Sequence, residues 1–275
     1  MAVCKKSLRK IQRISVSEKV KVPDMNVDLG TIVESLKLLG LKNGDAVLVH
    51  SSLSSFGYVE GGSETVIKAL IRCVGEEGTI VIPTLTGKRE DGPDNPPVFD
   101  VRNTPCWTGR IPNEFMKDPR SKRSLHPTHS VSVIGPLTEF LIKDHENSIT
   151  PCGKESPYYR LAQKGGYILL IGVNQESNST LHTVEEIAKV PYHMQKMPTN
   201  CVIIDYNGNK SIKSLYLHDW GTPRNFQVID NDLEKLGIMR KEKCGNSTLR
   251  LIKSIDMIEY VLNKLIHNPE YLVKK

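Results

Sequence analysis

A βαβ pattern between residues 31 and 84 constrains the fold of this chain more than any other feature of its sequence. Two strand-length apolar runs, DAVLVH and GTIVIP, enclose a segment whose apolar side chains recur at helical spacing. Those side chains are Val66, Ile67, Leu70, Ile71 and Val74. Two strands joined through a helix normally lie parallel in one sheet. We therefore expect an α/β protein with a mixed, largely parallel sheet sandwiched by helices.

The remaining segments predict how this sheet is completed. Residues 86–112 are rich in Pro, Gly and Asp and lack periodicity, and a loop of that length in a compact domain is usually functional. NCVIIDYNG and IKSLYL predict a β-hairpin, and SIDMIEYVLNKLI predicts a terminal helix. We expect residues 1–24 to form a basic N-terminal tail and residues 25–275 to form a single domain.

Composition narrows the class of protein. The 275 residues are 39% hydrophobic and 25% charged, and no apolar segment approaches the ~20 residues of a membrane span. Six cysteines without CxxC spacing, and an N-terminus without the apolar core of a secretory signal, predict a cytoplasmic protein. The net charge of +6 fits a small anionic partner, because the sequence lacks the basic segments interleaved with aromatic residues that nucleic-acid binding would require.

The segment NSTLHTVEEIAKVP carries the strongest candidate for chemistry. It follows the apolar run YILLIGV, so a helix here would begin where a strand ends, at the edge where open α/β sheets bind ligands. Residues three apart are neighbours on a helix, so His182 can contact Glu185, and a histidine oriented by a carboxylate can act as a general base. Either Thr180 or Thr183 could be the N-cap of this helix. Alternatively, Thr183 and Glu186 form an ordinary capping box, with His182 as a surface residue before it.

Two polar loops are candidates for binding an anion. HSSLSSFG leaves a strand and GGSE opens the next helix, so hydroxyl and backbone N–H groups are available to a phosphate. PRSKRSLHPTHS offers Arg120, Lys122 and Arg123, which could clamp phosphates. An ordinary polar loop and a solvated basic loop are the alternatives.

Histidine and cysteine residues open two further alternatives. His126 and His129 could bind zinc with Cys152 or His145 as a third ligand, although Pro127 breaks the helical geometry of an H-x-x-H site. Cys152 could be a nucleophile, but the flanking proline and Gly-Lys indicate a turn and a structural role. The histidines without a visible partner are expected to be structural: His145, His193, His218 and His267.

Five blocks of the sequence follow one another in a characteristic order. They are VHSSLSSFGYVEGG, RSLHPTHSVSVIGP, CGKESPYYRLAQKGGYILLIGV, SNSTLHTVEE and GNSTLRLIKSIDMIEYV. Their order and spacing resemble the aminoglycoside 3-N-acetyltransferase family, from about residue 28 to residue 263. The resemblance implies the antibiotic acetyltransferase fold, a mixed α/β sandwich. It also implies a cytoplasmic antibiotic-resistance enzyme that uses acetyl-CoA and no metal to N-acetylate an aminoglycoside.

The resemblance carries roles over to individual residues. On the T-L-H-x-x-E block it places the catalytic pair on His182 and Glu185. Thr180 could orient the amine or the carbonyl oxygen, or serve as a helix N-cap. The residues expected on the coenzyme A side are Ser51, Ser52, Ser54, Arg123, Ser124, His126 and Ser130.

Acyl transfer from a thioester to an amine fits this pair. Alkyl amines are mostly protonated at neutral pH, so the acceptor must lose a proton, which His182 could take. Glu185 would fix the imidazole tautomer, and the substrate itself would be the nucleophile, so direct transfer needs no acyl-enzyme. The basic loop would meet the phosphates of coenzyme A. Asp91, Asp94 and Asp100 would meet a cationic acceptor, or else form turns.

Two other functions stay open: a metal-dependent hydrolase using His126 and His129, and a non-catalytic protein that binds coenzyme A. GPDNPPVFDVRNTPCWTG departs from the antibiotic-resistance members, and His218, Asp219 and Trp220 fall in another variable region. Because substrate choice resides in such loops, the acceptor could be another amino sugar or amine. Neither nucleic acid nor a membrane is expected as a partner, and both a monomer and a homo-oligomer are compatible with the sequence.

Overall fold

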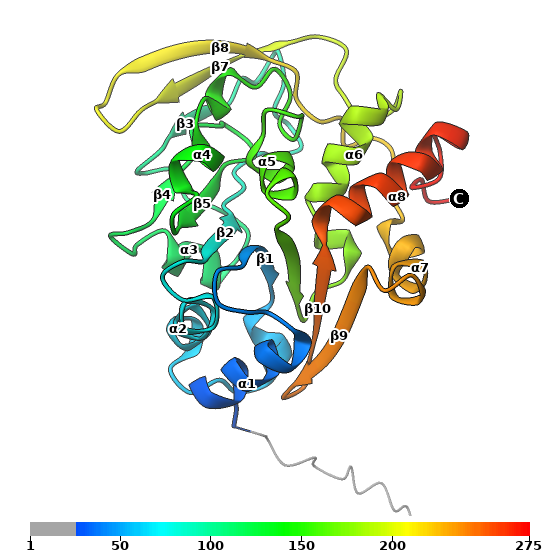
Figure 1. The fold of residues 1–275 in the computed structure, drawn as a ribbon. Helices are drawn as coiled ribbons and strands as arrows, with labels where there is room; N and C mark the ends of the chain where they lie inside the picture. Colours follow the sequence, from blue (N-terminus) through cyan, green and yellow to red (C-terminus); the bar gives the residue numbers. More distant parts are fainter. Residues whose placement is uncertain (1–25) are drawn as a thin grey trace, which may run out of the picture.

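A seven-stranded sheet forms the centre of the molecule (Figure 1). The computed structural model describes residues 26–275, so the expected tail at residues 1–24 lies outside the described residues. From one edge to the other, the strands are β4 (Lys122–Arg123), β5 (Val131–Ile134), β2 (Thr79–Pro83), β1 (Ala46–Ser51), β6 (Tyr167–Ile171), β10 (Ser247–Lys253) and β9 (Met239–Cys244). The two apolar runs of the βαβ pattern are β1 and β2, as predicted.

The sheet is mixed, but its antiparallel pairs outnumber its parallel ones. β1 pairs parallel with β2 and β6 at the centre, whereas β5, β4, β10 and β9 are added antiparallel. The α/β class is confirmed, and the largely parallel arrangement holds for the three central strands. The outer pairs β4–β5 and β9–β10 are each joined by a short connection, which can link only antiparallel neighbours.

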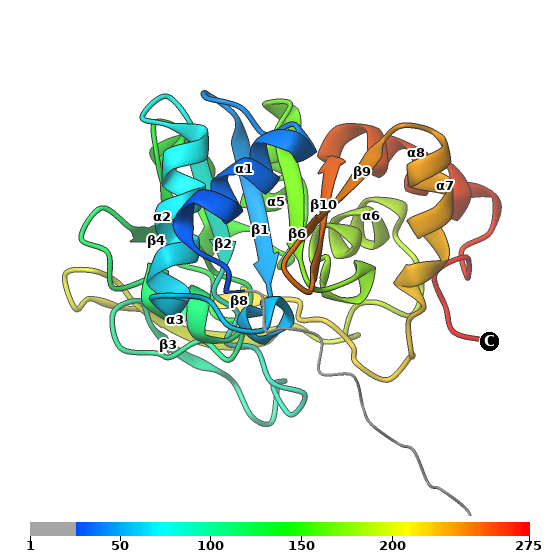
Figure 2. The same cartoon turned by 90° about the horizontal axis from the view of Figure 1, so that it is seen from below.

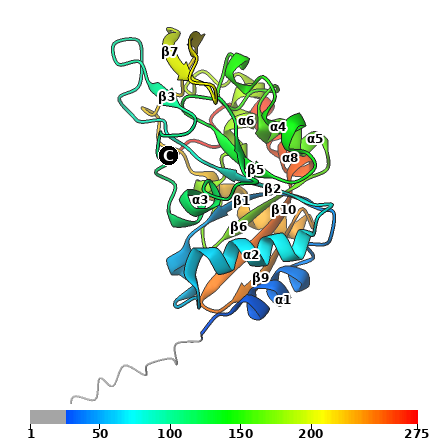
Figure 3. The ribbon, with the colours of Figure 1, turned by 90° about the vertical axis from the view of Figure 1, so that its left-hand side faces the viewer.

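Helices cover both faces of this sheet and make it the middle layer of a sandwich (Figure 3). One face carries α1 (Leu29–Leu39), α2 (Gly62–Val74) and α3 (Arg110–Phe115), and Figure 2 shows α1 and α2 side by side. The other face carries α4 (Thr138–Ile142), α5 (Pro157–Gln163), α6 (Thr180–Ala188), α7 (Asp230–Lys235) and α8 (Ser254–His267). In the described part of the chain, no helix is long and apolar enough to cross a membrane.

The central strands contribute to both cores at once. Val47 and Val49 of β1 pack in the core that contains α1 and α2, while Leu48 packs in the core that contains α5, α6 and α8. Successive side chains of a strand point to opposite faces, so a strand covered on both faces must be apolar throughout. This explains why the βαβ runs show no alternation of polar and apolar residues.

A smaller sheet lies at one end of the molecule (Figure 1). It consists of β3 (Val98–Asp100), β7 (Thr199–Ile204) and β8 (Lys210–Leu215). β7 and β8 form the predicted hairpin, and β3 pairs parallel with β7. The segment at residues 86–112 therefore contains a strand. The pairing of this strand with β7 determines the position of the residues that follow β3.

Helix α6 begins shortly after β6 ends, as the sequence predicted. Ser179 occupies the N-cap position without a side-chain hydrogen bond, and Oδ1 of Asn178 accepts the backbone N–H of Thr180 at 3.2 Å. The prediction of Thr180 or Thr183 as the N-cap is therefore wrong. The capping box is wrong too, because Thr183 lies inside the helix and the carboxylate of Glu186 contacts other segments.

Gly172, directly after β6, determines how closely the serine-rich loop approaches the sheet. Its φ of +64° lies in the left-handed region, and a Cβ atom at this position would lie 1.7 Å from Oγ of Ser55. The Ser55 hydroxyl is held in place because it donates to the carbonyl of Ser52 at 2.6 Å. Glycine alone meets both requirements.

We predict that Gly172→Ala lowers the free energy of unfolding more than Gly208→Ala does. Both substitutions place a side chain at positive φ, which costs about 1 to 2 kcal/mol. Gly208, at φ +81°, has open space around it, so it serves as the matched control. The clash with Ser55 adds about 1 to 3 kcal/mol at Gly172 alone. Denaturant unfolding measures both losses, and equal losses would show that the loop yields to a methyl group.

Candidate active site

His182 and Glu185 form the predicted contact on α6. Nδ1–H of His182 donates to Oε2 of Glu185 across 2.8 Å, which leaves Nε2 as the nitrogen that can accept a proton. The Glu185 side chain has no exposed surface, whereas that of His182 is 15% exposed. The pair thus joins an accessible imidazole to a buried carboxylate that fixes its orientation and tautomer.

The buried Glu185 carboxylate is satisfied by a guanidinium from far away in the sequence. Nε–H of Arg224 donates to Oε1 at 2.9 Å, and Nδ1 of His193 lies 3.2 Å from Oε2. Arg224 also donates from its second terminal nitrogen to Nδ1 of His193 at 3.0 Å. Because Nδ1 of His193 accepts from Arg224, the guanidinium is the group that replaces the water lost by the buried charge. Local spacing does not reveal Arg224 or His193, because both meet α6 only in the folded chain.

The neighbouring Glu186 organises a second group of side chains. Its Oε1 accepts the backbone N–H of Cys152 at 2.9 Å and Nε2–H of His218 at 2.8 Å. Burial raises the pKa of Glu186 to about 8, because the charged carboxylate is poorly stabilised away from water. The two consecutive glutamates therefore hold different partners within one buried polar cluster.

Four histidine rings lie together in this cluster. His182 stacks on His193 with 5.0 Å between ring centroids, and His218 lies 4.1 Å from His193 and 4.4 Å from His129. Burial lowers the pKa of His129, His193 and His218 well below the usual value, so these rings are neutral at neutral pH. The indole of Trp220 stacks on His129. The sequence predicted structural roles for His193 and His218. The structure places both rings in the site itself.

A cavity of about 240 Å³ opens beside His182, at the carboxyl ends of β1, β2 and β6. Trp107 and Trp220, the two tryptophans of the chain, both line it. A second cavity of about 250 Å³ shares His182, Trp220 and Glu176 with the first and adds the carboxylate of Asp219. The sheet edge that the sequence predicted to bind ligands therefore contains two cavities, and His182, the predicted base, lines both.

A groove of about 600 Å³ adjoins the first cavity. Ser51 and Thr108 line both spaces, so they separate the cavity from the groove or border both. Ser52 and Ser54, which the sequence placed on the coenzyme A side, also line the groove. Among the described residues, its one cationic lining side chain is Arg110, which the sequence did not single out because it lies outside the basic clusters.

Arg123 is a structural residue and does not face the groove, in contrast to the sequence prediction. It is 4% exposed, and it donates to Oγ of Ser130 and the carbonyls of Thr84 and Thr104 at 2.6 to 2.9 Å. Its guanidinium also lies over the ring of Phe99, and burial lowers its pKa to about 10. A phosphate has no access to a guanidinium whose donors are committed inside the protein.

The rest of the RS-x-HP-x-x-S block is internal as well. Oγ of Ser124 accepts the backbone N–H of Val131 and contacts Nδ1 of His145, each at 2.9 Å. Nδ1 of His126 accepts the backbone N–H of His129 at 3.1 Å, within its own turn. The block residues carried over to coenzyme A are therefore buried around the β4–β5 connection: Ser124, His126 and Ser130. They hold the turn that presents His129 to the cavity.

The other basic residues of this segment lie elsewhere. Arg120 and Lys122 form exposed ion pairs with Asp118 and Glu139. They line a separate groove beside α2, which shares no described lining residue with the cavities around His182. The sequence left two interpretations of this loop, a phosphate clamp and a solvated basic loop. Arg120 and Lys122 fit the solvated basic loop.

The acidic residues of the 86–112 segment form turns. Asp91 accepts the backbone N–H of Lys88, and Asp100 accepts those of residues 102 and 103. Asp94 is exposed, and none of the three lines a cavity around His182. Thr180 is buried and lines neither cavity. The segment instead reaches the site through Trp107 and Thr108.

Comparisons with known proteins agree with this fold. A sequence model of the family described as aminoglycoside 3-N-acetyltransferase matches residues 48–265. The chain is 32% identical to an SPbeta prophage-derived aminoglycoside N(3')-acetyltransferase-like protein of Bacillus subtilis (strain 168), over 89% of this chain and 94% of the relative. It is 32% identical to aminoglycoside N(3)-acetyltransferase IV of Salmonella sp., over 86% and 87% of the two chains.

Solved structures give the same result. A variant of aminoglycoside acetyltransferase AAC(3)-IVa, in complex with a gentamicin, is 30% identical and superposes with a TM-score of 0.78, over 91% of this chain and 92% of that one. The fold and the site thus define an α/β acyltransferase. The chain belongs to the aminoglycoside 3-N-acetyltransferase family, which confirms the resemblance of the five sequence blocks.

We predict that Arg123→Ala sharply lowers the melting temperature. The substitution leaves several buried acceptors without a donor, and each unsatisfied group costs about 1 to 3 kcal/mol. Arg120→Ala is the matched control, because a surface ion pair contributes about 0 to 1 kcal/mol. Thermal unfolding followed by circular dichroism measures both variants. Equal melting temperatures would contradict the structural role of Arg123.

Proposed function

We propose that this enzyme transfers the acetyl group of acetyl-CoA directly to an amino group of an aminoglycoside or a related amine, with His182 as the general base. One observation carries the proposal. The imidazole that contacts Glu185 at 2.8 Å lines a cavity, and that cavity shares Ser51 and Thr108 with a serine-lined groove. A base in a cavity that adjoins a second binding space suits a reaction that brings two substrates together.

In the proposed step the acceptor nitrogen attacks the carbonyl carbon of the thioester. The C–N bond forms, the C–S bond breaks, and Nε2 of His182 takes a proton from the attacking amine. Glu185, held by Arg224, stabilises the imidazolium that results. The imidazolium then returns its proton to the departing thiolate, which regenerates the base. Since the substrate is the nucleophile, no acetylated enzyme is formed.

We assign coenzyme A to the groove. The hydroxyls of Ser51, Ser52 and Ser54 suit the amides and phosphates of the coenzyme, and Arg110 can donate charge-assisted hydrogen bonds to a phosphate. Because Ser51 and Thr108 line both spaces, a thioester extending along the groove would reach the cavity beside His182. This assignment keeps Ser51, Ser52 and Ser54 from the residues expected on the coenzyme A side, and it replaces Arg123 with Arg110.

We assign the acceptor to the two cavities around His182. Trp107 and Trp220 offer ring faces that can pack against a sugar or an ammonium group. Glu176 and Asp219 supply carboxylates for further ammonium groups of a polycationic acceptor. The solved complex of the related AAC(3)-IVa with a gentamicin supports an amino sugar of this kind.

We predict that His182→Ala lowers turnover at least about 100-fold while the KM for acetyl-CoA stays nearly unchanged, because the base acts only during the transfer. Glu185→Gln should be milder, since it keeps the shape and removes the charge. Thiol release from acetyl-CoA, measured with a panel of aminoglycosides and simple amines, provides the assay. His267→Ala, on the surface at the end of α8, is the matched control. Unchanged turnover of His182→Ala with a competent acceptor would refute its role.

We predict that Arg110→Ala raises the KM for acetyl-CoA about tenfold or more, since a hydrogen bond to a charged group contributes about 1.5 to 3 kcal/mol. Acetyl-pantetheine, which lacks the nucleotide, should be indifferent to the same change. Arg120→Ala, on the other groove, should affect neither donor. An equal loss with both donors would mean that Arg110 acts on the reacting end or on the fold.

A further inference from the structure

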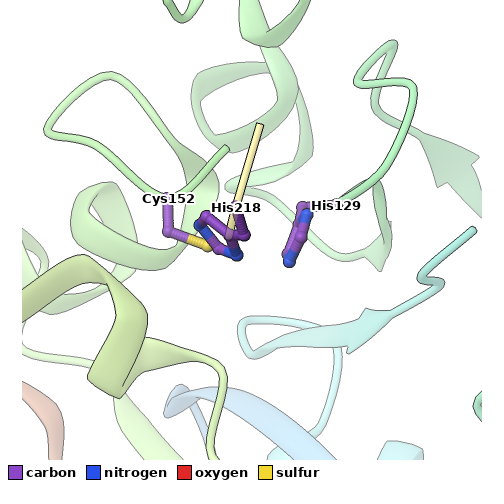
Figure 4. A group of neighbouring side chains, drawn as sticks. All are labelled: His129, Cys152 and His218. Atoms are coloured by element: carbon purple, nitrogen blue, oxygen red, sulfur yellow. The ribbon is translucent and has the colours of Figure 1, made fainter. Parts of the chain in front are cut away.

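Three buried metal-ligating side chains converge beside the candidate base. His129 precedes β5, Cys152 lies between α4 and α5, and His218 follows β8, so the three come from separate segments. One ligand atom of each lies within 4.8 Å of those of the other two. Figure 4 shows the three as neighbouring side chains, with the ring of His129 to one side of His218 and Cys152. Thiolate sulfur and imidazole nitrogen are the ligands that zinc prefers in proteins.

We propose that His129, Cys152 and His218 bind a zinc-class divalent ion, a site that is separate from the His182–Glu185 pair and independent of the acceptor's identity. On binding, the Cys152 thiol loses its proton to solvent and both rings coordinate through neutral nitrogens. The nitrogen–sulfur donor set selects zinc, or cobalt as its spectroscopic substitute, over magnesium and calcium, which take oxygen ligands.

The orientation of His218 supports this assignment. Nε2–H of His218 donates to Oε1 of Glu186 at 2.8 Å, and Nδ1 is buried without a hydrogen-bond partner among the described residues. A carboxylate that holds one nitrogen of a histidine while the other binds the metal is the usual outer shell of a zinc site. The same oxygen of Glu186 accepts the backbone N–H of Cys152, so one carboxylate orients two of the three ligands.

The third ligand is oriented in a similar way. Nδ1 of His129 is hydrogen-bonded to Oγ1 of Thr128 at 2.9 Å, which leaves Nε2 for an ion. At tetrahedral angles, two ligand atoms on one zinc lie about 3.3 to 3.6 Å apart, given bond lengths of about 2.0 to 2.3 Å. One ligand atom of each residue lies within 4.8 Å of those of the other two, so side-chain rotations that bring them closer would complete the site.

A second convergent group shares one residue with the first. His182, His193 and His218 also have ligand atoms within 4.8 Å of one another. In that group, however, the guanidinium of Arg224 donates to Nδ1 of His193. A cationic guanidinium beside a ligand disfavours a bound cation. The group that contains Cys152 avoids Arg224 and provides an anionic ligand.

Three protein ligands leave one coordination position open, which is the pattern of zinc sites that bind an exchangeable molecule. His129 lines the cavity beside His182, and His218 lines the second cavity. An ion bound between these two cavities would therefore be reachable by a small ligand such as water or an amine.

The experiment uses the full-length protein, stripped with a chelator and titrated with Co²⁺. We expect one equivalent to bind with a thiolate-to-cobalt charge-transfer absorption, and Zn²⁺ to displace it. Calorimetry should give an affinity for Zn²⁺ that falls at least about 100-fold in Cys152→Ser and about 10- to 100-fold in Glu186→Gln. Cys201→Ser, which alters a cysteine equally buried but in the small sheet, is the matched control and should bind as the unmodified protein does.

Several results would overturn the proposal. Absence of binding refutes it outright. Cobalt bound without the charge-transfer band, with an affinity that depends on His193 and is indifferent to Cys152→Ser, would place the ion in the all-histidine group instead. The spectrum of the unmodified protein decides between sulfur and all-nitrogen ligation even if Cys152→Ser fails to fold, which its thermal unfolding would reveal.

Discussion

A carboxylate without any exposed surface is the constraint on which the site depends. Glu185 sits on the first helix after β6, and its charge requires partners that replace water. His182 supplies one from the same helix, and Arg224 supplies another from a segment that follows the small sheet. Because a buried charge left unpaired costs several kcal/mol, helix and loop must adopt their relative positions together. The orientation of the base is thus a consequence of how the interior is neutralised.

Two mostly buried arginines, Arg224 and Arg123, fix the positions of the loops that line the cavities through hydrogen bonds. Arg224 lies four residues after Trp220, and its contact with Glu185 ties that loop to α6. Arg123 donates to the carbonyl of Thr104, three residues before Trp107, and so ties the long loop to the β4–β5 connection. Both guanidinium groups belong to a basic chain whose net charge is +6. Because these two positive charges donate hydrogen bonds inside the protein, they are not available to a ligand. The net charge alone therefore says little about an anionic partner.

The features predicted correctly from the sequence are those that depend on the spacing of residues within one strand or one helix. The βαβ runs and the contact of His182 with Glu185 follow from strand and helix periods. The direction of the outer strands depends on how the connections run, which the apolar pattern does not encode. His193 and His218 join the site through long-range packing, so isolated histidines could not be assigned to it. Arg123 was misplaced because a basic loop looks the same in sequence whether its guanidinium faces solvent or the core.

The position of the tryptophans has a practical consequence. The chain contains two, Trp107 and Trp220, and both line the cavity beside His182. Indole emission responds to the polarity and the quenchers around the ring, and here neutral imidazoles lie close to Trp220. The tryptophan fluorescence of the protein therefore originates entirely at the site. Ligand occupancy can be read from this signal without a label, and with no background from tryptophans elsewhere in the fold.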